Sequence, residues 1–170
     1  FIQVRNEQKE RNVSQAILPL YHTTSASKTN YWFGTSYDLT NQIRLKTRMQ
    51  FSTYSIRSAK TSGMALVQDL QVSFNKLKLT ARYALFDTDD YDNRQYVYEN
   101  DVWLAYSLPA LSGVGTRHLL QAEYKLTSWM RLWARLARLQ YHLQDEIGTG
   151  LEKISGDTKT EVKFQVMFSF

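Results

Sequence analysis

The sequence contains no cysteine. This absence excludes a disulfide-stabilised scaffold, a cysteine-ligated zinc or iron–sulfur site, and thiol catalysis. No run of apolar residues approaches the ~18 that a membrane-spanning helix requires. No internal repeat indicates a solenoid or a propeller, and no tract is of low complexity. The chain has 170 residues, enough for one domain and at most a small second one.

The chain is rich in aromatic and basic residues. Aromatic side chains make up 14% of the residues, too many for a disordered chain. Lysine and arginine number 21 against 16 acidic residues, which gives a net charge of +5. The mean hydropathy of −0.44 is typical of a soluble protein, but an average hides how residues are ordered along the chain. The chain starts at Phe1 in mid-pattern, so either a signal peptide has been removed or this is the ordered part of a longer chain, and we favour the second.

Residues 42–53 alternate strictly between two kinds of side chain. One parity is apolar or threonine: Ile43, Leu45, Thr47, Met49, Phe51 and Thr53. The other parity carries three cations, Arg44, Lys46 and Arg48. Side chains alternate across a strand, whereas a helix would scatter these cations around its circumference. The pattern predicts a strand with one apolar and one basic face.

The same two-residue period recurs along the chain. It is clear in residues 64–74, 76–86, 116–126 and 161–170, and weaker in residues 30–39 and 96–107. Residues 128–141 fit either an amphipathic helix or a strand, and their neighbours favour a strand. Short connections between such strands predict an antiparallel meander.

The start of the chain lacks this order, because residues 7–28 fit no period. We therefore predict a loop or surface segment there. The domain prediction is an irregular or partial-strand N-terminal segment over residues 1–29, followed by a barrel over residues 30–170.

An antiparallel meander with one apolar face fits a soluble sandwich or a transmembrane barrel. The predicted strands run about 10–13 residues, against ~5–6 in globular proteins. Aromatic residues gather at strand ends, and the apolar parity is almost free of charge. These features favour an all-β fold, an antiparallel transmembrane β-barrel of about eight strands. Eight strands close a small barrel by themselves, and the same pattern also fits part of a larger one.

The end of the chain resembles the β-signal of outer-membrane proteins, an alternating strand that finishes on an aromatic residue. The residues that carry it are Phe164, Val166, Phe168 and Phe170. The resemblance implies recognition by the barrel assembly machinery and a last strand that runs toward the periplasm. The strand count then puts the loop at residues 88–93 on the periplasmic side and the tight turn at Asn75 outside. This reverses the usual placement of short and long connections, so either a crossing near residues 91–107 is miscounted or the loops are atypical.

The polar parity of each strand predicts the barrel interior. Its basic residues are Arg44, Lys46, Arg48, Lys78, Arg82, Arg117, Arg131 and Arg135, and its acidic residues are Asp69, Glu99, Asp101 and Glu123. Buried carboxylates are costly unless they are paired. We therefore expect a lattice of salt bridges that plugs and stiffens the barrel. The excess of cations would attract anions if the interior were open.

Other chemistry finds weaker support. Asp87, Asp89 and Asp92 offer oxygen ligands for Ca²⁺, but they lack EF-hand spacing, and a solvated acidic loop is the simpler interpretation. His118 falls on the lipid-facing parity, His142 lies in a polar loop, and no GxSxG motif is present. We predict no catalytic residue, metal or other cofactor. The strict alternation also argues against an exposed nucleic-acid surface.

Three further stretches carry a family resemblance. They are the run FDTDDYDNR with the following YVYEND, the tetrapeptide SLPA, and the run GTGLEKI. Together they resemble the C-terminal barrel region of large outer-membrane proteins of the Bacteroidota, of the helix-hairpin-helix domain-containing type. The match covers roughly residues 63–170, and nothing here matches the helix-hairpin-helix region itself. The resemblance implies an outer-membrane barrel and no catalytic activity.

We therefore expect a structural or assembly component of a complex in the outer membrane of a Gram-negative bacterium. The first alternative is an anion-favouring pore, and a less favoured one is an outer-membrane hydrolase. The expected partners are outer-membrane lipid, the barrel assembly machinery during insertion and other outer-membrane subunits. No nucleic-acid partner is expected.

Overall fold

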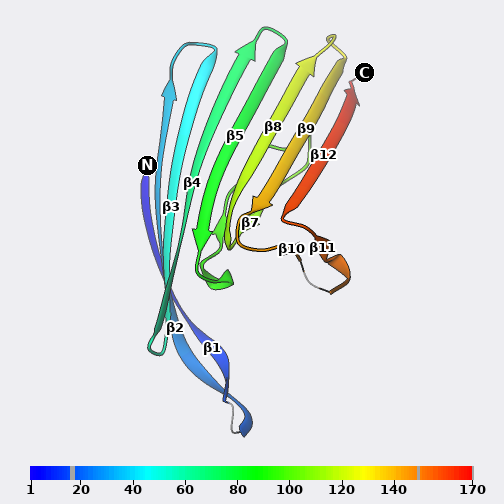
Figure 1. Cartoon of the computed structure of the whole chain (residues 1–170). Coiled ribbons are helices and arrows are strands. Elements are labelled where there is room, and N and C mark those ends of the chain that lie inside the picture. The colour runs from blue at the N-terminus through cyan, green and yellow to red at the C-terminus, as the bar shows by residue number, and fades with distance from the viewer. Residues whose placement is uncertain (16–17, 149, 170) are drawn as a thin grey trace.

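The computed structural model describes residues 1–15, 18–148 and 150–169 (Figure 1). Eight long strands form its frame: β1 (Ile2–Gln15), β2 (Leu18–Asp38), β3 (Ile43–Ile56), β4 (Ala59–Phe74), β5 (Leu77–Thr88), β8 (Val114–Lys125), β9 (Met130–Tyr141) and β12 (Thr158–Phe168). Short elements lie in the two long connections: η1 (Tyr91–Asn93), β6 (Gln95–Tyr96), β7 (Ala110–Leu111), β10 (Glu146–Ile147), η2 (Gly150–Glu152) and β11 (Ile154–Ser155). The described residues contain no α-helix, and hence no helix long and apolar enough to cross a membrane.

The eight long strands form one antiparallel sheet in the order β1-β2-β3-β4-β5-β8-β9-β12. Each strand pairs with the next long strand in the chain, which confirms the predicted all-β antiparallel meander. The ambiguous segment at residues 128–141 is a strand, β9. The sheet is not closed, because β1 and β12 form its two edges and do not pair with each other (Figure 1).

The predicted loop at residues 7–28 is wrong where the structure describes that stretch. Those residues lie in β1 and β2, which pair continuously from Ile2↔Phe33 to Val13↔His22. The hydrophobic period failed here because both faces are polar. Successive positions such as Gln8, Lys9 and Glu10 pair with Ser27, Ala26 and Ser25. Backbone hydrogen bonding holds these strands together without an apolar face.

The predicted strand at residues 96–107 is also wrong as a crossing of the sheet. Only Gln95 and Tyr96 are in a strand there, paired with Leu111 and Ala110, and one bridge joins Glu99 to Ser107. The segment 97–109 is instead an extended loop that lies against one face of the sheet (Figure 1). We call that face the inner face and the opposite one the outer face. Tyr98 is exposed while Val97 and Glu99 are buried, so the alternation in the sequence reflects an extended chain with one buried side.

Without the predicted crossing at residues 96–107, the short turns and the long connections separate to opposite ends of the sheet. The short turns 39–42, 75–76 and 126–129 lie at one end of the sheet, which also holds Ser169, hydrogen-bonded to Trp129. The long connections 89–113 and 142–157 leave and re-enter the sheet at the other end, where the turn at 57–58 also lies (Figure 1). We call these the turn end and the loop end. The conflict in the predicted loop placement came from the extra strand.

The outer face is apolar and exposed. Its side chains include Met49 at 52% exposure, Leu120 at 53% and Phe164 at 68%. The inner face is largely buried beneath the 89–113 connection, with a core of Ala65, Val67, Ala84, Phe86, Val97, Leu111, Leu139 and Tyr141. Apolar residues of the sheet, both small ones such as Ala84 and large ones such as Phe86, thus pack against the connection, while further large apolar residues point outward.

Candidate functional site

The segment 97–109 is fixed to the inner face by contacts from strands across most of the sheet. Gln50 on β3 donates a hydrogen bond to the carbonyl of Tyr96, immediately before the segment, and Arg82 on β5 donates one to the Tyr98 carbonyl. The indole of Trp103 stacks on that of Trp133 on β9, with ring centroids 6.1 Å apart. A single short segment is therefore within reach of strands that are several positions apart, as expected if the sheet curves around it.

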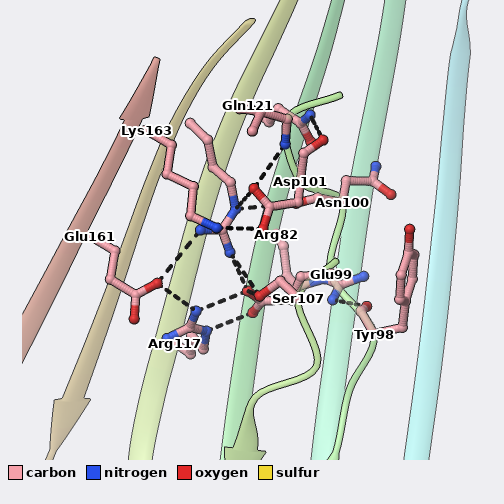
Figure 2. A network of polar contacts seen from close by, with 12 residues as sticks. Arg82, Tyr98, Glu99, Asn100, Asp101, Ser107, Arg117, Gln121, Glu161 and Lys163 are labelled. Atoms are coloured by element: carbon pink, nitrogen blue, oxygen red, sulfur yellow. Dashed lines mark hydrogen bonds and ion pairs between the residues drawn. The ribbon is translucent and has the colours of Figure 1, made fainter. Parts of the chain in front are cut away.

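Glu99 is at the centre of the polar contacts (Figure 2). Only 1% of this residue is exposed. Its carboxylate accepts hydrogen bonds from Arg117 Nε on β8 at 2.6 Å and from Arg135 Nη2 on β9 at 2.6 Å. A second contact from Arg117, at 2.9 Å through Nη2, makes that pair bidentate. Charge-assisted bidentate pairs are the strongest and most directional of protein hydrogen bonds.

Asp101 binds the cations on the last two strands. Its Oδ2 accepts a hydrogen bond of 2.6 Å from Lys163 on β12, and its Oδ1 lies 3.8 Å from Arg135 Nε. Arg135 and Lys163 are direct cross-strand partners, an arrangement that is unfavourable for like charges. Burial opposes ionisation of the Asp101 carboxyl, but hydrogen bonds from Lys163 and the Val102 amide, with the charge of Arg135, hold its pKa below its ordinary value.

Glu161 on β12 completes the cluster. Its Oε2 lies 3.8 Å from Arg117 Nη2 and 3.6 Å from Arg135 Nη1. The cluster therefore contains three acidic groups and three cations: Glu99, Asp101, Glu161, Arg117, Arg135 and Lys163. Breaking a buried pair by removing one partner typically costs about 3–5 kcal/mol, because the other charge stays buried and uncompensated. The ion-pair cluster thus joins the segment 97–109 to the strands β8, β9 and β12.

Each carboxylate of the ion-pair cluster lies beside a guanidinium or an ammonium group. His118 is an exposed outer-face residue, and His142 is an exposed loop residue whose amide bonds to the Val114 carbonyl. The structure brings neither imidazole to the ion-pair cluster.

The other predicted interior residues fall into two groups, those that have an ion-pair partner and those that have none among the described residues. Arg82 and Asp69 form a bidentate pair on the inner face, with hydrogen bonds that include Nη2 to Oδ2 at 2.7 Å. Arg131 pairs with Glu123 at 3.3 Å at a partly exposed position, and Arg44 pairs with Asp38 near the turn end. Lys46, Arg48 and Lys78 have no ion-pair partner among the described residues. All four predicted acidic residues are in ion pairs.

The residues predicted as a weak Ca²⁺ site do not form one coordination sphere. Asp89 accepts hydrogen bonds from the Ser62 amide and hydroxyl, and Asp92 lies 3.6 Å from Arg11. Asp87 is exposed at the loop end of β5. Nowhere in the described residues do three His, Cys, Asp or Glu side chains lie close enough to hold a metal ion.

The C-terminal residues interpreted as an assembly signal lie on the outer face of β12. Val162, Phe164, Val166 and Phe168 are exposed there, and Phe168 stacks on Trp129 with ring centroids 5.9 Å apart. Phe170, the last residue of the proposed signal, lies outside the described residues.

Two residues of the ion-pair cluster, Glu161 and Lys163, were absent from the predicted site. Both lie on the inner parity of the final strand, so the alternation could have identified them. The partner of Lys163 could not be identified, because Asp101 reaches it from a segment that is not a strand of the sheet.

Comparison with known proteins gives no relative for this chain. No protein-family model matches the sequence, and no curated protein or solved structure is significantly similar to it.

Proposed function

We propose that the chain forms the wall of an outer-membrane β-barrel whose inner side is stiffened by the ion-pair cluster, and that it serves as a structural or assembly component in a Gram-negative bacterium. The outer face carries this proposal. We call a set of residues that pair in register across all eight strands a register row. In one such row on the outer face, three strands carry polar residues, Thr158, Gln140 and Thr116. The other five carry apolar residues, Leu85, Leu66, Met49, Phe33 and Ile2. The apolar band therefore crosses the strands obliquely.

The slope of this band can be estimated from the register. At the loop end of β12 the band stops at Val162, whose row reaches Leu45 on β3 through Leu136, Leu120, Ala81 and Leu70. On β3 the band continues to Phe51, six residues farther, or about 20 Å at ~3.4 Å per residue. Five strand spacings of ~4.8 Å separate β12 from β3, or about 24 Å. The resulting angle of about 40° falls within the ~35–45° tilt of transmembrane barrel strands.

The height of the band is also suitable. On β4 it runs from Met64 to Phe74, interrupted by Gln68. Ten residue steps at this tilt rise about 26 Å, close to the ~25 Å of the apolar band on outer-membrane barrels. An exposed apolar band of this size is unusual on a monomeric soluble protein.

A membrane location requires partners for the edges of the sheet. Unpaired backbone N–H and C=O groups cost several kcal/mol each in hydrocarbon. The proposed function therefore needs β1 and β12 to pair, either with each other or with further strands. β1 and β12 run antiparallel, because they are the first and last of eight alternating strands. They can therefore pair with each other as antiparallel neighbours, and each can also pair with a further strand.

Labelling of single introduced cysteines tests the proposal. The chain has no cysteine of its own, so every labelled thiol is the introduced one. Leu120→Cys and Leu136→Cys place a thiol on the outer face, and Leu143→Cys places one in a connection where the side chain is 80% exposed. In liposomes, we expect a membrane-impermeant maleimide to label Leu143→Cys on the accessible side and to leave the other two unlabelled until the membrane is dissolved. Equal labelling of all three, with a chain that stays monomeric in buffer without detergent, would contradict the membrane proposal.

An anion-favouring pore is the second candidate. Lys46 and Arg48 are half-buried on the inner face of β3 and have no ion-pair partner among the described residues. Both line a cavity of about 340 Å³, and Lys46 also lines a neighbouring one of about 490 Å³. Planar-bilayer recording separates the two functions. Discrete conductance steps whose anion preference is lost in Lys46→Glu would favour a pore, and a silent bilayer would favour the structural role.

A further inference from the structure

Three side chains interrupt the apolar outer face at adjacent positions. Arg138 on β9 pairs in register with His118 on β8, which pairs with Tyr83 on β5. The rings of Tyr83 and His118 lie 4.9 Å apart. All three residues are exposed, and neither Arg138 nor His118 has an ion-pair partner within 4.0 Å among the residues the structure describes. An exposed cation next to a broad apolar surface calls for an external anion.

On β9 and β8, Arg138 and His118 mark the border of the apolar band toward the loop end. One row toward the turn end lie Val162, Leu136 and Leu120, all apolar and exposed. One row toward the loop end lie the polar residues Thr158, Gln140 and Thr116. If the band is in hydrocarbon, as the proposed function holds, Arg138 and His118 lie at the depth of the lipid headgroups. Basic and aromatic side chains are stable at that depth, whereas a charge at the bilayer centre is costly.

We propose that Arg138, with His118 and Tyr83, binds the phosphate of an anionic lipid in the leaflet on the loop side. The guanidinium fork matches two phosphate oxygens, and the Tyr83 hydroxyl and an imidazole N–H offer further donors. The acyl chains of the same lipid lie on Leu120 and Leu136. This apolar surface beside the cation selects a lipid over a free phosphate ion. The inference depends on the membrane location and extends it to a specific lipid site.

Lipid retention tests the site. The folded protein is released from nanodiscs of equimolar phosphatidylglycerol and phosphatidylcholine, and the bound lipids are counted by native mass spectrometry. We expect the wild-type protein to retain phosphatidylglycerol preferentially. Arg138→Gln should reduce that preference about fivefold, equivalent to the ~1 kcal/mol of one basic residue at an anionic surface. His118→Gln should reduce it in the same direction.

Lys60→Gln is the matched control, because Lys60 is an exposed cation on the outer parity of β4, beyond the band at the same end. It should leave the preference unchanged. Equal retention in wild type and Arg138→Gln, or equal loss in Lys60→Gln, would overturn the site. Inorganic phosphate that displaces the lipid would show that the site takes the free ion instead. Failure of the membrane location itself is recognised separately, by labelling of Leu136→Cys in liposomes.

Discussion

Lys163 Nζ lies 2.6 Å from Asp101 Oδ2, a contact that joins the last strand to a segment 62 residues earlier in the chain. The Asp101 side chain is fully buried, while that of Lys163 is 40% exposed. The two ends of this pair therefore differ in what their loss would cost. The buried Asp101 carboxylate forms ion pairs with both Arg135 and Lys163. The ammonium group of Lys163 can instead be hydrated if Asp101 is removed.

Asp101→Asn should destabilise the protein more than Lys163→Met. The first change leaves Arg135 and Lys163 facing each other, at a cost of about 3–5 kcal/mol. The second removes a partly screened pair and one of the two opposed cations, at a cost of about 1 kcal/mol or less. Urea unfolding in detergent, followed by tryptophan fluorescence, measures both. Equal losses would show that Asp101 does not mediate between the two cations.

Glu99→Gln should be the most damaging single change in the segment. It removes the carboxylate that lies closest to two buried guanidinium groups, at an expected cost of about 3–5 kcal/mol. Near-ultraviolet circular dichroism from the stacked Trp103 and Trp133 should weaken as the segment detaches. Glu123→Gln, which breaks a partly exposed pair with Arg131, is the control and should cost less than ~1 kcal/mol. A small effect of Glu99→Gln would mean that packing holds the segment.

The depressed pKa of Asp101 predicts a specific acid response. The unfolded carboxyl titrates near its ordinary value of 3.8, and the folded one titrates lower. The stabilisation is therefore complete above the unfolded pKa and is lost as the pH falls through the folded pKa. The difference in unfolding free energy between wild type and Asp101→Asn should be constant from about pH 8 to pH 5 and shrink below about pH 4. A difference that already declines near pH 6 would contradict this assignment.

The oblique band predicts that two substitutions in one register row have different effects. Leu66→Arg places a charge inside the band, at an expected cost of about 2–4 kcal/mol in a bilayer. Gln140→Arg, in the same row on β9, places it outside the band near Asp157, at an expected cost of about 0–1 kcal/mol. Folding equilibria in liposomes measure both. Equal costs would mean that the border of the membrane follows the register row.

The side-chain alternation predicted most of the sheet because one parity of each strand is apolar. For β9 the alternation left a helix and a strand open, and the neighbouring strands favoured the strand that the structure shows, with Leu132 and Leu136 on the outer parity and Trp133 and Arg135 on the inner one. It failed for residues 7–28, where β1 and β2 are polar on both faces. There is no hydrophobic signal to read in a hairpin held by backbone hydrogen bonds.

The ion-pair cluster was predictable in type but not in arrangement. The inner parity supplied Arg117 and Arg135, and the need for paired carboxylates indicated Glu99 and Asp101. The alternation of residues 96–107 was interpreted as a crossing strand because an extended segment with one buried side has the same period. Which acid meets which cation depends on how that segment lies across the sheet, and this is set by contacts 18 to 62 residues apart in the chain.

The direct opposition of Arg135 and Lys163 sets an order of assembly. Without the segment, β9 would meet β12 with two cations side by side, and only Glu161 nearby to offset them. Asp101 removes that repulsion when the segment is in place. The segment should therefore dock on β8 and β9 before the last strand adds to the sheet. The inserted loop then acts as an internal template, and a chain whose segment is delayed should accumulate as a seven-stranded intermediate with β12 unpaired.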